Sequence, residues 1–237
     1  MAIELSVILP CYMEAANLRV LFPRLLRVLD GIDHEILVVD TEQPLDDTAQ
    51  TIRDFANHKI IHTRRKGQNY GDAVRHGLKL ARGRWVVFMS ADMQHRPETI
   101  TDLWRNKEDM DMVAASRYVQ GGGSALSYSL IIKSVALNKL CQFLYGKKLR
   151  DYSSEYRLCR GDDLRKLELS ANHFAIIVEM AAQLMILHPG YRIQEMPFTI
   201  QQRFHGQTKR RSMPFYWDYA TTFFRLWQLK TFTRYLF

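Results

Sequence analysis

The chain has 237 residues, of which 47% are hydrophobic, so it can bury a substantial core and is not a disordered protein. Its 33 lysines and arginines outnumber its 25 aspartates and glutamates, and the formal net charge of +8 favours an anionic partner such as nucleic acid, a phosphorylated substrate or lipid headgroups. The three cysteines, Cys11, Cys141 and Cys159, fit neither a disulfide framework nor a zinc site, which favours a reducing cytoplasm.

Apolar runs of strand length alternate with stretches of helical periodicity in the first half of the chain. Strands are predicted at residues 3–10, 34–40, 59–63, 85–89 and 111–116. Helices are predicted at residues 16–30, 46–57, where Asp47 or Thr48 would be the cap, 71–83, and 97–104, which opens at Pro97. Strands separated by helices predict an α/β protein with a mostly parallel sheet that helices cover on both faces.

Beyond Gly123 this alternation stops. Residues 124–146 form the longest apolar stretch, but Lys133 and Lys139 within it would be costly in a bilayer. We therefore expect an amphipathic helix that lies on a surface, and no transmembrane helix. Residues 191–198 have the pattern of a strand. The first residues lack the basic and small-residue features of a signal peptide, so none is expected.

Polar side chains follow the carboxyl ends of the predicted strands. In open α/β sheets the ligand lies outside these strand ends, so side chains there should meet in one crevice. The candidates are Tyr12 and Glu14 after the first strand, Asp40 after the second, Asp92 and Gln94 after the fourth, and Arg117 after the fifth.

Asp92 and Gln94 stand two residues apart in an extended segment, so their side chains should point the same way. A carboxylate and an amide oxygen suit a hard cation such as Mg²⁺ or Mn²⁺, which completes its shell with water and substrate phosphates. Asp92 could instead cap the helix expected at Pro97 or stabilise a turn. Asp40 could likewise contact a ribose or a base, or form a turn.

A basic loop surrounds Gly206 and contains Arg203, Lys209, Arg210 and Arg211. Such a loop could fold over a diphosphate and offset charge on a leaving group, while a solvated basic turn and a lipid-facing patch are the alternatives. The sequence has no GxxxxGK[ST] phosphate-binding motif, no G-x-S-x-G nucleophile motif and no HExxH zinc motif. The hydrolases that these motifs identify are therefore excluded.

Several segments, taken in order, resemble the family 2 glycosyltransferases of GT-A fold, and within them the dolichyl- or polyprenyl-phosphate mannosyl and glucosyl synthases. The segments are SVILPCYMEAANL, EILVVD, GDAVRHGLKLARGRWVVFMSADMQHRPE, ASRYVQGGG, DYSSEYR, GYRIQEMPF and RFHGQTK, and they spread over about residues 3 to 209. The resemblance implies a GT-A (Rossmann-like) sheet flanked by helices, with C-terminal amphipathic helices. It also implies inverting transfer of a sugar from a nucleotide-diphosphate sugar.

The resemblance further implies which residues bind the donor. The nucleoside would lie against Pro10, Tyr12, Glu14, Val38 and Asp40, and the sugar diphosphate against Ser90, Ala91, Asp92, Arg117, Arg203 and Lys209. In the D-x-D motif of the family the first acid touches the donor and the second binds the metal. Asp92 would thus be the principal ligand of Mg²⁺ or Mn²⁺, with Gln94 near it.

Two departures from the family pattern lie at the donor end. Ser90 stands where the first acid of D-x-D is usual, so one negative charge is missing. After the second strand the family usually reads D-D-G-S-x-D-x-T, whereas DTEQPLDDT keeps Asp40 and replaces most of the rest. The identity of the nucleotide sugar and the strength of metal binding depend on these positions.

The expected reaction is displacement at the anomeric carbon, with Asp92 and its metal, Arg117, Arg203 and Lys209 offsetting charge on the leaving diphosphate. A lipid monophosphate has a second pKa of about 6 and is already largely ionised at neutral pH, so it needs no strong base. Asp151 would then orient the acceptor or donor. For a hydroxyl acceptor Asp151 would be the leading base candidate, and a salt bridge to Arg157 or a lysine is the alternative.

The expected organisation is a catalytic domain over residues 1–210, with a nucleotide-sugar half (1–120) and an acceptor half with its closing loop (121–210). An aromatic amphipathic helix over 211–237 follows. Its composition and that of residues 124–146 favour a lipid-phosphate acceptor and an anionic membrane surface, with the protein peripheral on the cytoplasmic face. The alternatives are a subunit contact in a homo-oligomer, a soluble or glycan hydroxyl acceptor, and an inactive scaffold. No nucleic-acid recognition motif is visible, so nucleic acid is not expected as a partner.

Overall fold

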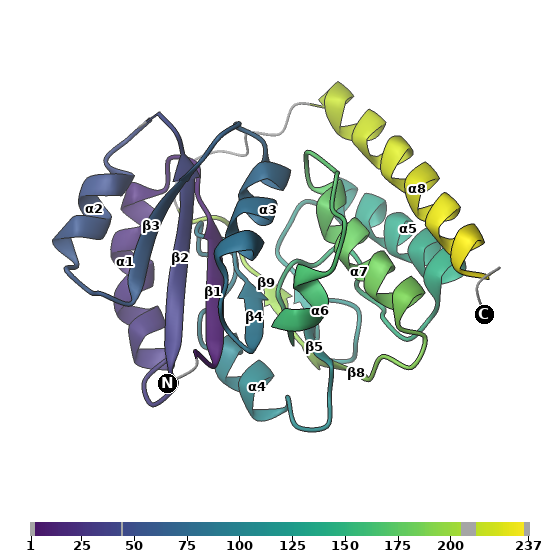
Figure 1. Ribbon diagram of the computed structural model, residues 1–237, viewed down its shortest axis with the longest axis horizontal. Coiled ribbons are helices and arrows are strands. Elements are labelled where there is room, and N and C mark those ends of the chain that lie inside the picture. The colour runs from purple at the N-terminus through teal and green to yellow at the C-terminus, as the bar shows by residue number, and fades with distance from the viewer. Residues whose placement is uncertain (1–2, 44, 205–211, 235–237) are drawn as a thin grey trace.

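The computed structural model of the protein describes residues 3–43, 45–204 and 212–234 (Figure 1). Its strands are β1 (Leu5–Pro10), β2 (His34–Thr41), β3 (Ile60–Arg65), β4 (Trp85–Phe88), β5 (Met112–Ser116), β6 (Gly123–Ser124), β7 (Arg157–Arg160), β8 (Ile193–Pro197) and β9 (Thr199–Ile200). Its helices are α1 (Ala15–Val28), α2 (Thr48–Asp54), α3 (Tyr70–Leu80), α4 (Thr99–Arg105), α5 (Tyr128–Tyr145), α6 (Gly161–Arg165), α7 (Ala175–Leu187) and α8 (Ser212–Arg234).

Most of these strands form one mixed sheet in the order β3-β2-β1-β4-β7-β5-β8. Neighbouring strands are parallel except at β7, which runs antiparallel to both β4 and β5. The short strands β6 and β9 pair in parallel beside it. The predicted α/β architecture with a mostly parallel sheet is confirmed, and the carboxyl ends of β1, β2 and β4 lie at one edge.

Alternate residues along the strands face opposite sides of the sheet and build two hydrophobic cores. In β1, Leu5, Val7 and Leu9 belong to the core formed with α1, α2 and α4. Ile8 belongs to the other core, which includes residues of α3, α5, α6, α7 and α8. Because helices cover both faces, the strands read as nearly continuous apolar runs in the sequence.

Strand β7 is the element of the sheet that the sequence pattern does not predict. It is short and carries an arginine at each end, Arg157 and Arg160. Arg157 is buried, and its guanidinium donates hydrogen bonds to the carbonyl oxygens of Asp151 at 2.9 Å and Tyr152 at 2.6 Å. These bonds allow a charged group to be buried in a strand that pairs with β4 and β5.

The start of α4 differs from the prediction that placed it at Pro97. The N–H groups of Thr99, Ile100 and Thr101 donate to carbonyl oxygens three residues earlier in the chain. Such bonds close a tighter turn than the α-helix, so the helix proper begins at Thr99. Pro97 thus lies in the turn that precedes the helix.

Helix α8 packs on α7 and lies beside α5 at one end of the molecule (Figure 1). The carboxylate of Asp218, which is 7% exposed, accepts the backbone N–H groups of Asn172 at 2.9 Å and His173 at 2.8 Å, just before α7. Lys230 of α8 also donates to the carbonyl oxygen of Leu144 in α5. Among the helices of the described ranges, none has an apolar run long enough to cross a membrane.

We expect Asp218→Ala to lower the free energy of unfolding by about 2 kcal/mol, because two backbone donors lose a charged acceptor. In a chain of this size the midpoint of thermal unfolding should fall by about 4–8 °C. Asp162→Ala is the matched control, since that carboxylate is 85% exposed and pairs with Arg165 one turn away. Equal midpoints for the two variants would show that Asp218 does not anchor α8.

Candidate active site

The carboxyl edge of the sheet brings Asp92 of the β4 end and Glu14 of the β1 end to the same cation, Arg203. One carboxylate oxygen of Asp92 lies 2.8 Å from Arg203 Nη2, and Glu14 Oε1 lies 3.3 Å from Arg203 Nη1. Asp92 and Glu14 are both buried. The guanidinium therefore bridges the two strand ends in the crevice where the sequence predicts a diphosphate and a cation.

The segment that carries Arg203 is held against the Asp92 segment by its backbone. The N–H of Phe204 donates to the carbonyl oxygen of Asp92 at 3.2 Å, and the N–H of Gln201 donates to that of Gln94 at 3.1 Å. The side-chain amide of Gln94 donates in turn to the carbonyl oxygen of Gln201 at 3.2 Å. Lys209, which was predicted to contact the donor, lies outside the described residues.

Ser90 and His95 frame Asp92. The Ser90 hydroxyl is buried and has no hydrogen-bond partner within the part of the chain that the structure describes. The backbone N–H of Ser90 donates to His95 Nδ1 at 3.1 Å. Burial lowers the pKa of His95 to about 4, so the imidazole is neutral at pH 7 and Nδ1 can accept this bond. His95 was not predicted from the sequence, because the hydrogen bond between its ring nitrogen and the Ser90 N–H cannot be inferred from the spacing of the residues.

The residues around Asp92 fit a divalent cation that takes most of its ligands from elsewhere. No group of three or more His, Cys, Asp or Glu side chains able to hold a metal occurs among the residues with a described position. Asp92 supplies a carboxylate, and the unpartnered Ser90 hydroxyl leaves a polar atom that a ligand can satisfy. Mg²⁺ and Mn²⁺ often bind through one or two carboxylates plus substrate phosphates, so a cation here would depend on a bound diphosphate.

Asp40 lies at the edge near the end of β2, and both of its carboxylate oxygens are engaged. Oδ1 accepts the N–H of Thr41 at 2.7 Å, and Oδ2 lies 3.3 Å from His62 Nε2. His62 sits on β3 in register with Val38. Asp40 and His62 thus place a carboxylate and an imidazole where the nucleobase of the donor is expected. His62 was not predicted from the sequence.

A buried arginine supports this side of the crevice from β3. Arg65 donates from Nη1 to the carbonyl oxygens of Cys11 at 3.2 Å and Val39 at 3.0 Å. The Cys11 carbonyl lies just after β1 and the Val39 carbonyl lies within β2, so one guanidinium links these neighbouring strands. Burial lowers the pKa of Arg65, which nevertheless stays charged near neutrality because arginine ionises far above this range.

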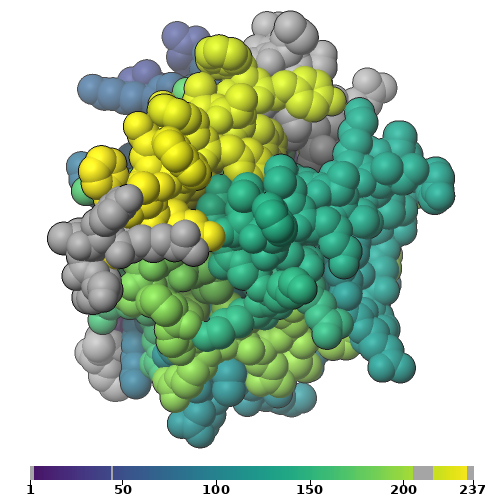
Figure 2. Space-filling model, turned by 90° about the vertical axis from the view of Figure 1, so that its right-hand side faces the viewer, coloured from purple at the N-terminus to yellow at the C-terminus, as the bar shows by residue number. Residues whose placement is uncertain are grey.

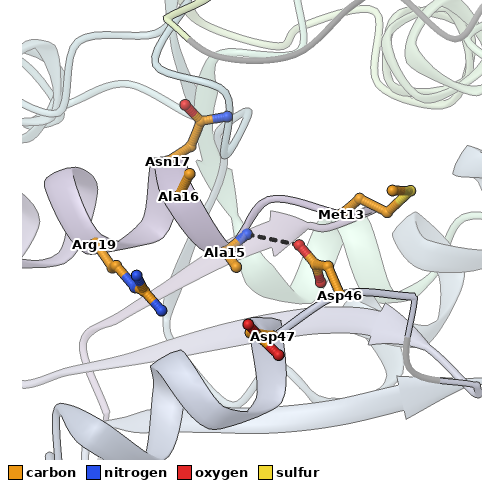
Figure 3. Close-up of a pocket in the computed structure, with 7 residues that line it drawn as sticks. All are labelled: Met13, Ala15, Ala16, Asn17, Arg19, Asp46 and Asp47. Carbon is orange, nitrogen blue, oxygen red and sulfur yellow. Dashed lines mark hydrogen bonds between the residues drawn. The ribbon is translucent and has the colours of Figure 1, made fainter.

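The loop that departs from the family pattern provides a helix cap. Asp46 Oδ2 accepts the N–H of Ala15 at 3.0 Å, at the start of α1 (Figure 3). Its Oδ1 accepts the N–H of Thr48 at 3.0 Å, at the start of α2. The prediction of Asp47 as the N-cap residue of α2 is confirmed, but its side chain makes no capping hydrogen bond, and the neighbouring Asp46 supplies the acceptor instead. A carboxylate at two helix N-termini is favourable because it meets unpaired N–H groups and the positive ends of both helix dipoles.

A hollow of about 350 Å³ opens beside this cap, next to Glu14 (Figure 3). Its lining residues are Met13, Ala15, Ala16, Asn17, Arg19, Asp46 and Asp47. Asn17 at its rim donates to Glu14 Oε2 at 2.5 Å. The remaining predicted donor residues lie at the same edge: Pro10 and Tyr12 are partly exposed, while Val38 and Ala91 are buried and can offer only backbone groups.

Arg117 and Asp151, both predicted to act in the reaction, form a buried ion pair. Arg117 Nε and Nη2 donate to the two oxygens of Asp151 at 2.8 and 2.7 Å, and the backbone N–H of Arg117 donates as well, at 3.1 Å. Burial alone would raise the pKa of Asp151, but the hydrogen bonds and charge of Arg117 outweigh it and hold the pKa below its usual value. Asp151 therefore forms a salt bridge, which was the alternative to a role in the reaction, but its partner is Arg117 and not Arg157.

Comparison with known proteins places the chain in a family. Residues 6–168 match glycosyl transferase family 2. The chain is 30% identical over 236 residues to a dolichol-phosphate mannosyltransferase of Pyrococcus furiosus, covering 94% of this chain and 63% of that protein. It is 28% identical over 227 residues to the dolichol-phosphate mannosyltransferase of Saccharomyces cerevisiae, covering 88% of this chain and 82% of that one. It thus spans less than two thirds of the length of the Pyrococcus protein.

Solved structures share the fold at lower identity. Glucosyl-3-phosphoglycerate synthase from Mycobacterium tuberculosis, in complex with Mn²⁺, UDP and phosphoglyceric acid, superposes with a TM-score of 0.69 at 16% identity, covering 94% of this chain and 78% of that one. The same enzyme with Mg²⁺ and UDP gives a TM-score of 0.70. From the family match and the shared architecture, the chain belongs to glycosyl transferase family 2 and has the GT-A fold.

Proposed function

We propose that the protein is an inverting glycosyltransferase that moves a sugar from a nucleotide-diphosphate sugar to a polyprenyl phosphate at a membrane surface. The donor would lie at the strand edge, with its nucleoside against Tyr12, Glu14 and Asp40 and its diphosphate near Asp92 and Arg203. The dolichol-phosphate mannosyltransferases among its relatives, and the UDP in structures of the same fold, support this class of donor and acceptor.

The ion pair of Arg117 with Asp151 is the observation that favours a phosphate acceptor. A hydroxyl acceptor needs a base, and the leading candidate, Asp151, is fully buried with both oxygens bound to Arg117. A phosphate monoester is already largely ionised at neutral pH, because its second pKa is about 6. It can attack the anomeric carbon without giving up a proton to the enzyme, while the bond to the diphosphate breaks.

The residues at the strand edge would stabilise the departing diphosphate. Arg203 would turn from Asp92 toward the phosphate oxygens, and Lys209 would join it from the closing loop. A divalent cation held by Asp92, with Gln94 beside it, would supply further positive charge against the leaving group. The Ser90 hydroxyl would donate a hydrogen bond to the nucleotide sugar at the position where the family usually has an acid.

Two adjacent helices carry the surface that suits a lipid acceptor. Figure 2 shows α5 and α8 side by side on one face, and Tyr145 of α5 stacks on Phe223 of α8 with ring centroids 6.2 Å apart. We define the aromatic face as seven of the large exposed apolar side chains of these two helices: Tyr128, Ile132, Phe143, Trp217, Phe224, Trp227 and Phe232. Exposed Lys133, Lys139 and Arg225 lie among them, a composition suited to an anionic membrane interface.

The proposal is tested with sugar-labelled UDP-, GDP- and dTDP-sugars, Mn²⁺, and anionic vesicles that contain a polyprenyl phosphate. We expect label to enter the extracted lipid with one class of nucleotide only. The double variant Trp217→Glu/Trp227→Glu should lose flotation with vesicles and most transfer to their lipid, yet keep transfer to a short, water-soluble prenyl phosphate. Leu80→Glu is the control, because Leu80 is exposed on α3, outside the aromatic face.

Three results would contradict the proposal in different ways. Label on a soluble or glycan hydroxyl, with none in lipid, would identify a hydroxyl acceptor. Unchanged flotation of the double tryptophan variant would remove the aromatic face from membrane binding. Absence of turnover with every donor and metal would favour an inactive scaffold.

A further inference from the structure

Two hydrogen bonds within residues 90–95 shape the segment that carries Asp92, and one of them is accepted by the His95 side chain. Ser90 N–H donates to His95 Nδ1 at 3.1 Å, and Gln94 N–H donates to Asp92 Oδ1 at 3.1 Å. Met93, within this segment, has a φ of +66°, in the left-handed region that residues other than glycine rarely adopt. Such a conformation persists only where its surroundings hold it, so the hydrogen bond to His95 helps to maintain the shape of the segment.

The His95 ring is itself held in one orientation. It stacks on Tyr156 with ring centroids 4.6 Å apart and an interplanar angle of 12°, and it meets Phe198 edge-on at 5.5 Å. Tyr156 directly precedes β7 and Phe198 directly follows β8, so both neighbours are adjacent to strands of the sheet. The Tyr156 hydroxyl donates to the carbonyl oxygen of Arg96 at 2.7 Å, which also ties down the residue after His95. The acceptor atom Nδ1 is therefore placed by the sheet.

We propose that His95 is a positioning residue for Asp92: by accepting the Ser90 N–H from a ring clamped between Tyr156 and Phe198, it sets the direction in which the Asp92 carboxylate meets a cation and diphosphate. This inference rests on the proposed function, because it assigns Asp92 to donor binding. The simpler alternative is that the ring only fills space beside Tyr156 and Phe198. The two differ in which part of the side chain matters, the acceptor nitrogen or the ring.

Two substitutions separate the acceptor from the ring. His95→Phe keeps a stacked ring but has no acceptor, whereas His95→Asn keeps an acceptor oxygen near the position of Nδ1 but has no ring. Binding of Mn²⁺ in the presence of UDP or GDP, followed by electron paramagnetic resonance, is measured for both variants, and thermal unfolding is measured in parallel. Nucleotide release from the sugar donor is a third readout.

We expect His95→Phe to weaken nucleotide-dependent Mn²⁺ binding about tenfold or more, and His95→Asn to bind within about threefold of wild type although it unfolds at the lower temperature of the two. Tyr156→Leu removes the stacking partner and the hydroxyl bond to Arg96 but leaves the acceptor nitrogen, so it should weaken Mn²⁺ binding less than His95→Phe does. If His95→Phe is recovered unfolded, His95→Leu takes its place in the same comparison.

Weaker Mn²⁺ binding by His95→Asn than by His95→Phe would overturn the inference and leave the ring as packing alone. Equal binding by both variants and wild type would overturn it as well. If wild type binds neither nucleotide with Mn²⁺, the proposed function fails, and the inference fails with it. These outcomes are distinguishable because the first two require a wild-type protein that binds.

Discussion

Asp92→Ala is expected to lower the rate of nucleoside diphosphate release by about 10²- to 10³-fold, the range seen when a single group that stabilises transition-state charge is removed. Asp92 is the carboxylate at the end of β4, and its partner Arg203 would lose its 2.8 Å contact in this variant. The rate should also lose most of its dependence on Mn²⁺. The measurement is release of labelled nucleotide from the sugar donor across a range of Mn²⁺ concentrations.

The matched control is Asp54→Ala, which removes an exposed carboxylate from the last residue of α2, at the opposite end of that helix from Asp46. This variant should keep the wild-type rate and metal dependence. Full activity of Asp92→Ala would place the metal and the diphosphate elsewhere. A loss of activity in both variants would show instead that the rate follows the overall charge of the protein.

Asp151→Ala is expected to lower the free energy of unfolding at pH 7 by about 3–5 kcal/mol, because it leaves the guanidinium of Arg117 buried without its counter-charge. Arg117 Nη2 and Asp151 Oδ1 are 2.7 Å apart, and both side chains are almost entirely enclosed. The double variant Arg117→Met/Asp151→Ala should recover part of this loss, since it removes the unpaired charge. Urea unfolding of wild type, Arg117→Met, Asp151→Ala and the double variant gives the coupling energy of the pair.

The same pair predicts a dependence of stability on pH. The pKa of Asp151 is lower in the folded protein than its usual unfolded value of about 3.9, so folding favours the ionised form. Its contribution to stability is complete above that unfolded value and is lost as the pH falls through the folded value. Wild type should therefore lose more stability than Asp151→Asn between about pH 5 and 2. Parallel curves for the two proteins would contradict the assignment.

Local patterns predicted most of the sheet and one side of the site. The strands of the first half were recognisable because they are buried on both faces and so are nearly continuous in apolar residues. Asp92, Glu14 and Asp40 could be predicted because each follows such a strand, and the ligand position in parallel sheets is a general property of the architecture. Strand β7 was not predictable in this way, because buried Arg157 interrupts its pattern.

The contacts among these residues required the three-dimensional structure. Arg203 lies far along the chain from Glu14 and Asp92, yet it bridges them. Arg117 and Asp151 were separate candidates in the sequence, and only their packing shows that each neutralises the other. His95 gains its role from Tyr156 and from a backbone N–H, neither of which a motif records.

The sequence by itself determined the α/β class and the strand ends at which the donor is expected, because hydrophobic periodicity and strand-end chemistry are properties of short segments. Its ordered motifs also carried the resemblance to the family that the comparisons then showed. The tertiary structure decided how the charges are paired: Arg203 with Asp92 and Glu14, and Arg117 with Asp151. It also decided that Asp46 caps two helices. Such pairings depend on distances between segments remote in the chain, and these distances are set only when both cores pack against the sheet.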